Sequence, residues 1–252
     1  ILPLITTAHM PVHPSLIYWV EMTTGGALFP QHNHNRNYGG VGYIEAKASD
    51  EGLFYAIADY ADDRLNDRVR GRYTPLQVAR WLTSLADQVT QALSDLPEDA
   101  AAVESARTRM TVTDLRMLAA LARYHAEKTR AAVHLALWQR TNNGSHLAPC
   151  RSHMTAAREH WRILSALGGV YIDDLCSQMN ATSMNARRGH WRDRLVEMNR
   201  DLERLDTLME DAPAERPPAS LGTPSASGTP GLQTVLFHVP ETWPAGETMP
   251  IR

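Results

Sequence analysis

The sequence predicts a mainly α protein, an antiparallel helical bundle that follows short strand and loop segments and precedes a linker and the start of a β module. Between residues 49 and 211, apolar residues recur every three or four positions, and Pro and Gly are concentrated at the joints between these runs. Outside this block, short apolar runs alternate with stretches rich in Pro and Gly. We therefore expect four parts: a strand and loop segment (1–48), an all-α domain (49–211), a Pro/Ser/Gly linker (212–231) and a β module (232–252).

The first part holds two apolar runs of strand length, Ile1–Thr7 and Leu16–Met22. Near-continuous apolar runs are typical of strands that are buried on both faces, as in a parallel sheet. Two prolines lie between the runs, which favours a loop over a helix there. The pattern predicts a strand and loop segment over residues 1–48, which is compatible with the end of a (β/α)₈ barrel.

The helical block is expected to begin with Ser49 as a cap, and Gly71 is expected to end the first helix. The next helix has a clear start, because Thr74 precedes Pro75 and Gln77 completes a capping box. Residues 98–141 form one long helical pattern in which we predict a break near Met110, because β-branched residues surround that position.

The second half of that pattern is apolar around much of its circumference, which predicts a central helix. The turn Asn142–Gly144 leads to a helix that Gly168 and Gly169 should stop, and so short a turn predicts an antiparallel pair. Apolar residues from Trp191 to Met209 then recur at alternating spacings of four and three, as in a coiled-coil seam.

Composition excludes several classes of protein. Acidic and basic residues are interleaved with a net charge of −3, which argues against a nucleic-acid interface and against a polybasic membrane surface. No apolar run reaches the length of a membrane-spanning helix, and no signal peptide is present in these residues, so an extracytoplasmic location stays open. The two cysteines, Cys150 and Cys176, form no C-x-x-C pair; buried free thiols and a single disulfide are both compatible with the sequence.

The sharpest candidate for chemistry is Tyr18-Trp19-Val20-Glu21, which ends the second apolar run and precedes a Gly-rich loop. Catalytic groups of (β/α)₈ barrels project from the C-terminal ends of strands, and aromatic rings suit the apolar faces of sugars. Glycoside hydrolysis needs two carboxyl groups, so a partner for Glu21 is expected upstream. The alternative is that Tyr18 and Trp19 pack in a core while Glu21 caps a loop.

Polar residues in the flanking loops are candidates for substrate contacts: His9, His32, His34 and Arg36. Imidazoles also bind metals, but the sequence has no H-E-x-x-H motif and no nearby run of Asp or Cys. Solvated loop residues are the plainer interpretation. We expect no metal and no cofactor.

The order of elements, together with Tyr18-Trp19-Val20-Glu21 and the Gly25-Gly26 loop, resembles the C-terminal part of a large bacterial glycoside hydrolase. The succession of a barrel and a helical domain is similar to that of family 67 α-glucuronidases. The resemblance implies a carbohydrate substrate, while the catalytic role of Glu21 and the sugar contacts of Tyr18 and Trp19 are predicted from the pattern at the end of the apolar run. The helical domain would support the barrel, close one side of the sugar cleft or form a homodimer.

Two other functions remain open at this point. The helices could be a non-enzymatic scaffold that binds another protein through the Trp191–Met209 seam. The chain could also belong to a metal-dependent enzyme that uses the histidines.

Overall fold

The computed structural model describes residues 1–8, 28–29, 43–48, 50–96, 106–171, 175–176 and 188–212. The chain divides into two units, Ile1–Pro218 and Ala219–Arg252, and all described residues fall in the first. The predicted segment Leu16–Met22, the linker and the β module therefore lie outside the described residues. The predicted helical bundle is confirmed.

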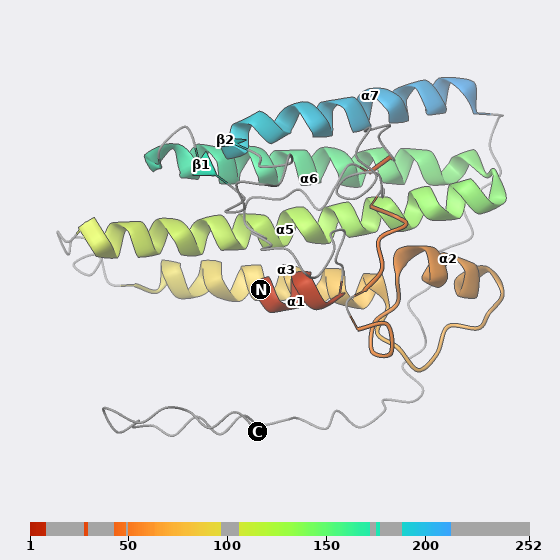
Figure 1. The fold of residues 1–252 in the computed structure, drawn as a ribbon, viewed down its shortest axis with the longest axis horizontal. Helices are drawn as coiled ribbons and strands as arrows, with labels where there is room; N and C mark the ends of the chain where they lie inside the picture. Colours follow the sequence, from red (N-terminus) through yellow and green to blue (C-terminus); the bar gives the residue numbers. More distant parts are fainter. Residues whose placement is uncertain are drawn as a thin grey trace. The chain divides into compact units, whose positions relative to one another are not determined.

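Four long helices lie side by side in the order α3 (Pro75–Ser94), α5 (Ala106–Thr141), α6 (Leu147–Leu167) and α7 (Leu195–Asp211) (Figure 1). Two shorter helices are α1 (Leu2–Ala8), which contacts α3, and α2 (Ile57–Leu65), which contacts α5. Among the described residues, 3₁₀ turns lie between the long helices at η2 (Gly144–His146), η3 (Gly168–Val170) and η4 (Trp191–Arg194). Strand β1 (Leu175–Cys176) pairs antiparallel with β2 (Arg188–Gly189).

The central position predicted for the long helix is confirmed. Helix α5 has 36 residues and packs against α2, α3 and α6, so buried side chains occur around much of its circumference. Its C-terminal turn uses Asn142, which has a φ of 51°, a conformation that Asn adopts more readily than most residues. This tight turn brings α6 back antiparallel to α5.

Trp161 is the largest fully buried side chain of the described residues. Its indole Nε1 donates a hydrogen bond to the carbonyl oxygen of Trp191 (2.7 Å), and its ring meets the ring of Tyr124 edge to face, with centroids 4.8 Å apart. Gly168 provides the space for the Trp191 ring, because a Cβ atom at that position would lie 2.6 Å from Cε3 of the indole. The core thus joins α5, α6 and the start of α7.

Two predicted helix boundaries are confirmed. Thr74 and Gln77 form the expected reciprocal capping box, with Gln77 N–H donating to Thr74 Oγ1 (3.2 Å) and Thr74 N–H donating to Gln77 Oε1 (2.8 Å). Helix α6 ends at Leu167 and the chain continues into η3 at Gly168, as the two glycines indicated.

The predicted strand Ile1–Thr7 is wrong, because this segment forms helix α1. Ile5 and Ala8, three residues apart, are buried on one face, and Ile5 N–H donates to the carbonyl of Ile1 (3.2 Å). A short apolar run does not distinguish a buried strand from a buried helix turn, and Pro3 is compatible with a first helical turn.

The predicted start of the helical block is also wrong. Helix α2 begins at Ile57 and ends at Leu65, so it neither starts after Ser49 nor reaches Gly71. Before it, the Asp50 carboxylate accepts hydrogen bonds from the backbone of Gly52 (3.1 Å) and Leu53 (3.0 Å), which closes a turn in place of a helix.

The break predicted near Met110 does not occur, since α5 is continuous through it. The hydroxyls of Thr111 and Thr113 donate to the carbonyls of Arg107 (3.0 Å) and Arg109 (2.9 Å) one turn earlier. These threonines therefore satisfy their polar groups within the helix, and their cost of a few tenths of a kcal/mol each does not interrupt it.

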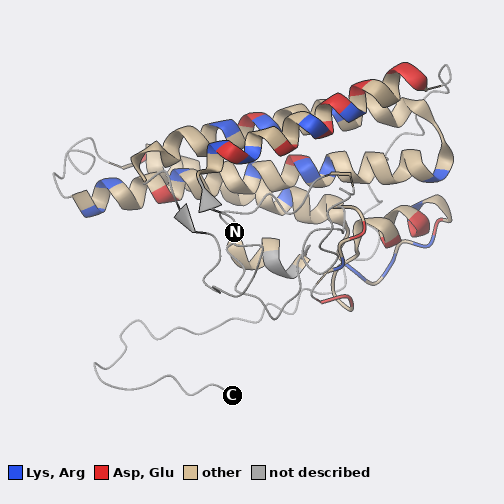
Figure 2. Ribbon diagram, turned by 45° about the horizontal axis from the view of Figure 1, so that its top comes forward, with Lys and Arg blue, Asp and Glu red and all other residues tan. Residues whose placement is uncertain are grey.

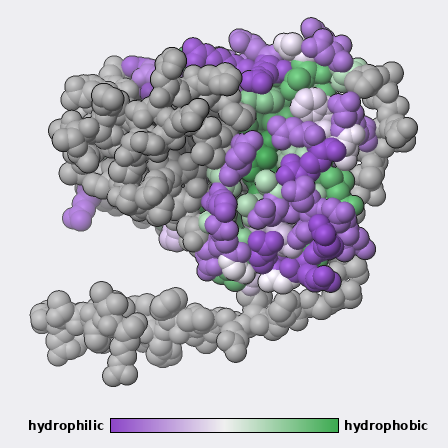
Figure 3. Space-filling view, turned by 45° about the vertical axis from the view of Figure 1, so that its right-hand side comes forward, coloured by the Kyte–Doolittle hydropathy of each residue, from purple (hydrophilic) through white to green (hydrophobic). Residues whose placement is uncertain are grey.

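The seam of α7 faces the bundle. Trp191, Met198 and Leu205 are buried, and α7 packs along α6. The Trp191–Met209 seam, proposed for binding another protein, is therefore covered largely by α6 of the same chain. Basic and acidic residues are interspersed along the helices (Figure 2), and hydrophilic residues dominate the described part of the face shown in Figure 3. No helix among the described residues is long and apolar enough to cross a membrane.

Candidate functional site

The site residues predicted from sequence all fall outside the described part of the chain: His9, Tyr18, Trp19, Glu21, His32, His34 and Arg36. Their roles stay predictions. The structure does describe residues on both sides of the 30–42 segment, and these residues enter a buried polar cluster of the bundle. It also describes an open groove between α3, α5 and α6.

The buried cluster is built around Asp201 of α7, which is 4% exposed. Its carboxylate accepts hydrogen bonds from the backbone N–H groups of Leu28 (2.7 Å) and Phe29 (3.4 Å). The Arg204 guanidinium lies 4.8 Å from the centre of the Phe29 ring. Helix α7 therefore holds the chain at residues 28 and 29 by both a carboxylate and a cation.

Lys128 of α5 supplies the opposite charge and is 1% exposed. Its Nζ donates to Tyr124 Oη (3.0 Å) and lies 4.6 Å from the centre of the Tyr43 ring. Burial lowers the pKa of Lys128 to about 8, although Asp201 and Glu197 oppose that change. Burial likewise raises the pKa of Asp201, against the attraction of Lys128 and the two backbone donors.

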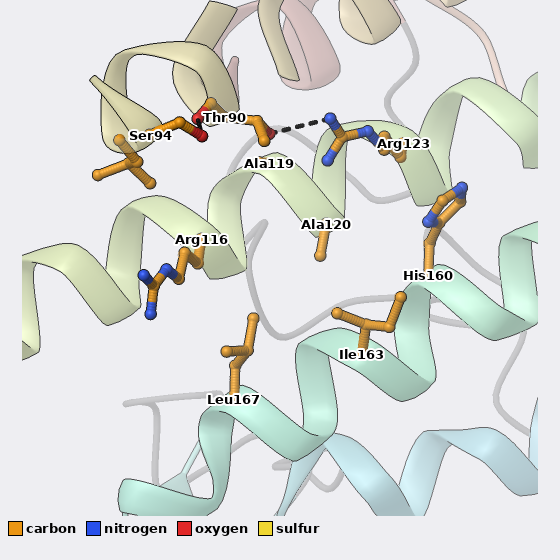
Figure 4. Close-up of a pocket in the computed structure, with 10 residues that line it drawn as sticks. Thr90, Ser94, Arg116, Ala119, Ala120, Arg123, His160, Ile163 and Leu167 are labelled. Atoms are coloured by element: carbon orange, nitrogen blue, oxygen red, sulfur yellow. Dashed lines mark hydrogen bonds between the residues drawn. The ribbon is translucent and has the colours of Figure 1, made fainter. Parts of the chain in front are cut away.

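The groove is an open hollow of about 510 Å³ on the bundle surface. Its floor is formed by the small residues Ala119 and Ala120 of α5, and its apolar rim includes Ile163 and Leu167 of α6 (Figure 4). Because these two side chains on α5 are small, a space remains between α3 and α6 that no described side chain fills. The lining is completed by Thr90, Leu93, Ser94, Arg116, Arg123 and His160.

Cationic and polar groups converge on this groove. Arg123 donates through one nitrogen to Asp87 Oδ1 and to Thr90 Oγ1, both at 2.9 Å, so its guanidinium is held in place (Figure 4). Arg116 lies two turns earlier on α5 and makes no hydrogen bond or ion pair with the described residues. Burial lowers the pKa of His160, and Arg123 lowers it further against the pull of Glu127. The groove is suited to an anionic group attached to an apolar face.

A row of histidines crosses the other end of the α5 and α6 pair. His134 and His146 face each other with their Nδ1 atoms 3.3 Å apart, and the His134 ring stacks on that of His153. His153 in turn contacts Glu127 (2.6 Å). Burial lowers the pKa of His134 to about 4, with His153 and His146 acting in the same direction.

The described residues contain no group of three or more side chains that could hold a metal ion. The histidines of the metal hypothesis, in the segment 9–34, lie outside that part of the chain. Cys150 is a free thiol, and burial raises its pKa, so it is not a reactive thiolate.

Comparison with known proteins finds no matching family model and no matching curated protein. Among solved structures, the chain is similar to a GH138 enzyme targeting pectin rhamnogalacturonan II. The TM-score is 0.55 with 15% sequence identity, over 62% of this chain and 23% of that enzyme. At this identity the likeness is one of fold, and this chain corresponds to less than a quarter of that enzyme. A region with this fold thus occurs within a glycoside hydrolase.

Sequence reasoning missed both the buried cluster and the groove. Arg123 pairs with Asp87 at the surface, and nothing in the local sequence indicates the hollow beside it. Lys128 carried a signal that could have been used, because residues four and seven positions away along its helix face are aromatic or apolar: Leu121, Tyr124, Ala132 and Leu135.

Proposed function

We propose that this chain is part of a glycoside hydrolase in which the helical bundle supports the cleft that binds the sugar. The likeness of the fold to part of a GH138 enzyme carries this proposal. The finer resemblance, to the arrangement of family 67 α-glucuronidases, belongs to the same proposal. It rests on Tyr18-Trp19-Val20-Glu21 and on the helical domain that follows, since the first predicted barrel strand forms helix α1.

In this proposal Glu21 is an acid/base or substrate-contacting carboxylate. His9, Tyr18, Trp19, His32, His34 and Arg36 contact the sugar. The bundle supports such a role because its buried cluster holds the backbone at residues 28 and 29, seven residues after Glu21.

Glu21→Gln in the natural full-length protein is expected to lower kcat about 10²- to 10⁴-fold, because a neutral amide cannot transfer a proton. The measurement is steady-state hydrolysis of a panel of oligosaccharides. Glu45→Gln is the matched control, since Glu45 is exposed and lies outside the proposed site. Unchanged turnover in Glu21→Gln would show that Glu21 has been assigned wrongly.

The groove adds a proposal about the saccharide itself. Arg116 and Arg123 favour a ligand with carboxylates, while Ile163 offers an apolar contact that is 39% exposed. The GH138 enzyme with a similar fold targets pectin rhamnogalacturonan II. We therefore assign the groove to a carboxylate-bearing part of the substrate.

Arg116→Ala is expected to weaken binding of an oligogalacturonide about tenfold, the effect of losing one charge-assisted hydrogen bond. Isothermal titration with the charged oligosaccharide and with a neutral one of equal length gives the comparison. Arg162→Ala is the control, because Arg162 pairs with Glu159 on the neighbouring surface of α6. Equal affinity for both oligosaccharides, or full affinity in Arg116→Ala, would contradict this assignment.

A further inference from the structure

His160 lies at one end of the groove, across from Arg123. Helices α5 and α6 are antiparallel, so Arg116 and Leu167, two turns away on their helices, lie at the other end (Figure 4). Two turns of helix correspond to about 11 Å. A ligand that carries carboxylates along its length can therefore meet Arg116 at one end and both Arg123 and His160 at the other.

The end of the groove beside Arg123 has hydrogen-bond donors but little net positive charge. The Arg123 guanidinium donates to the carboxylate of Asp87 on α3 (2.9 Å), so the two charges largely cancel. His160 is uncharged near neutral pH, because burial and, to a smaller degree, Arg123 keep its pKa below the ordinary value. A carboxylate that enters this end at neutral pH therefore meets polar groups without a free cation.

The acidic side chains that act on His160 are compensated as well. Glu127 of α5 accepts a hydrogen bond from Arg130 (2.5 Å), and Glu159 of α6 accepts one from Arg162 (2.6 Å). Both carboxylates raise the pKa of His160, but burial and the guanidinium across the groove outweigh them. His160 forms no hydrogen bond or ion pair with the residues that the structure describes. Its imidazole can therefore contact a ligand without giving up one of these residues as a partner.

We infer that His160 makes binding in the groove depend on pH: its imidazole takes up a proton from solvent when a carboxylate enters, and the imidazolium donates a hydrogen bond to that carboxylate. The inference rests on the proposed function, which assigns the groove to a carboxylate-bearing part of the substrate. No covalent bond of the ligand changes. His160 thus supplies, in mildly acidic solution, the positive charge that the Arg123–Asp87 pair does not supply.

The direction of the pH dependence follows from the charge of the ligand. A bound carboxylate raises the pKa of His160, because an adjacent negative charge favours the protonated imidazole. Between the pKa of the free protein and that of the complex, binding takes up a proton, so the affinity rises as the pH falls. A sugar carboxylate remains largely ionised at pH 5.5, since an ordinary carboxyl group has a pKa of about 4.

The test is isothermal titration of the natural full-length protein with an oligogalacturonide at pH 5.5 and at pH 8. Each titration is repeated in a second buffer of different ionisation enthalpy, which measures the protons taken up on binding. A neutral oligosaccharide of equal length is the ligand control. His160→Gln cannot be protonated at this position, whereas His160→Lys carries a positive charge at both pH values. Circular dichroism at both pH values checks that each variant is folded.

The wild-type protein should bind the oligogalacturonide about tenfold more tightly at pH 5.5 than at pH 8, which corresponds to a change of about one unit in the pKa of His160. Binding should take up protons from the buffer, and the neutral oligosaccharide should show neither effect. His160→Gln should bind at both pH values as weakly as the wild type does at pH 8. His160→Lys should bind at both as tightly as the wild type does at pH 5.5.

Two results would overturn the inference and leave the assignment of the groove intact. One is an affinity of the wild-type protein for the oligogalacturonide that does not change with pH. The other is a pH dependence that persists in His160→Gln. A wild-type protein that binds no oligogalacturonide at either pH would remove the assignment of the groove, and the role of His160 with it. The catalytic role of Glu21 would still be decided separately by Glu21→Gln.

Discussion

Trp161→Ala is expected to lower the free energy of unfolding by about 3–5 kcal/mol, the usual cost of truncating a buried Trp. The Trp161 side chain is fully buried between α5 and the start of α7. Its loss would leave a large cavity beside Tyr124. It would also leave the buried carbonyl of Trp191 without its donor, a further penalty included in that range. Urea unfolding followed by circular dichroism measures the change.

Two variants show whether the predicted reason is correct. Trp161→Phe retains most of the ring volume but removes the indole N–H, so it should cost clearly less than Trp161→Ala. Trp81→Ala is the matched control, because Trp81 is only partly buried and meets Tyr73 edge to face at 4.8 Å. If Trp81→Ala lowers the free energy of unfolding as much as Trp161→Ala does, the core is not centred on Trp161.

The same core links the bundle to the polar cluster. Trp191 packs over Gly168 and receives the Trp161 hydrogen bond, which fixes the beginning of α7 against α6. Asp201 lies ten residues further along the same rigid stretch. The position of its carboxylate therefore depends on apolar packing at the start of α7, and the backbone at residues 28 and 29 depends on that carboxylate.

Local chemistry explains which parts of this fold could be predicted. The capping box at Thr74 and the turn after Asn142 are set by side chains within a few residues, so the sequence indicated them. The antiparallel pairing of α5 and α6 followed from the shortness of the turn between them.

Segments that depend on tertiary contacts were predicted less well. Ile1–Thr7 is apolar enough for either a strand or a helix, and its contact with α3 decides the outcome. The threonines near Met110 disfavour a helix only weakly, and the packing of α5 outweighs that preference.

The candidate site likewise has parts that local sequence indicates and parts that only tertiary contacts create. Glu21 and its neighbours were chosen from local pattern, and they stay predictions because they lie outside the described residues. The groove exists only because three helices approach each other around Ala119 and Ala120. Its polar lining depends on Arg116 and His160, which come from different helices and are 44 positions apart in the sequence. No local pattern carries that information.

The second large effect is a loss of stability between pH 7.5 and pH 5. His134 is buried, and its pKa of about 4 in the folded state lies below the value of 6.5 for an unperturbed histidine. Between these two values the unfolded chain binds a proton that the folded chain does not bind, so stability falls as the pH falls. The stability that depends on neutral His134 is fully present above about pH 6.5, and its loss ends near pH 4.

The groups around His134 act in the same direction in that window. His153 and His146 both disfavour a charge on His134, and burial lowers the pKa of His146 as well. Glu127 lies further along this row, beyond His153. Burial would raise its pKa, but the His153 hydrogen bond and Arg130 outweigh that effect and lower it, so Glu127 loses its contribution only below the ordinary range of a carboxyl group.

For His134 alone, the free energy of unfolding should fall by about 2 kcal/mol between pH 7.5 and pH 5. Urea unfolding at a series of pH values measures the slope. His134→Gln cannot be protonated at that position, so its stability should fall clearly less between pH 7.5 and pH 5, with the remaining loss coming from His146 and His160. A wild-type slope that His134→Gln leaves unchanged would place the titrating group elsewhere in the protein, because no other substitution is made in that comparison.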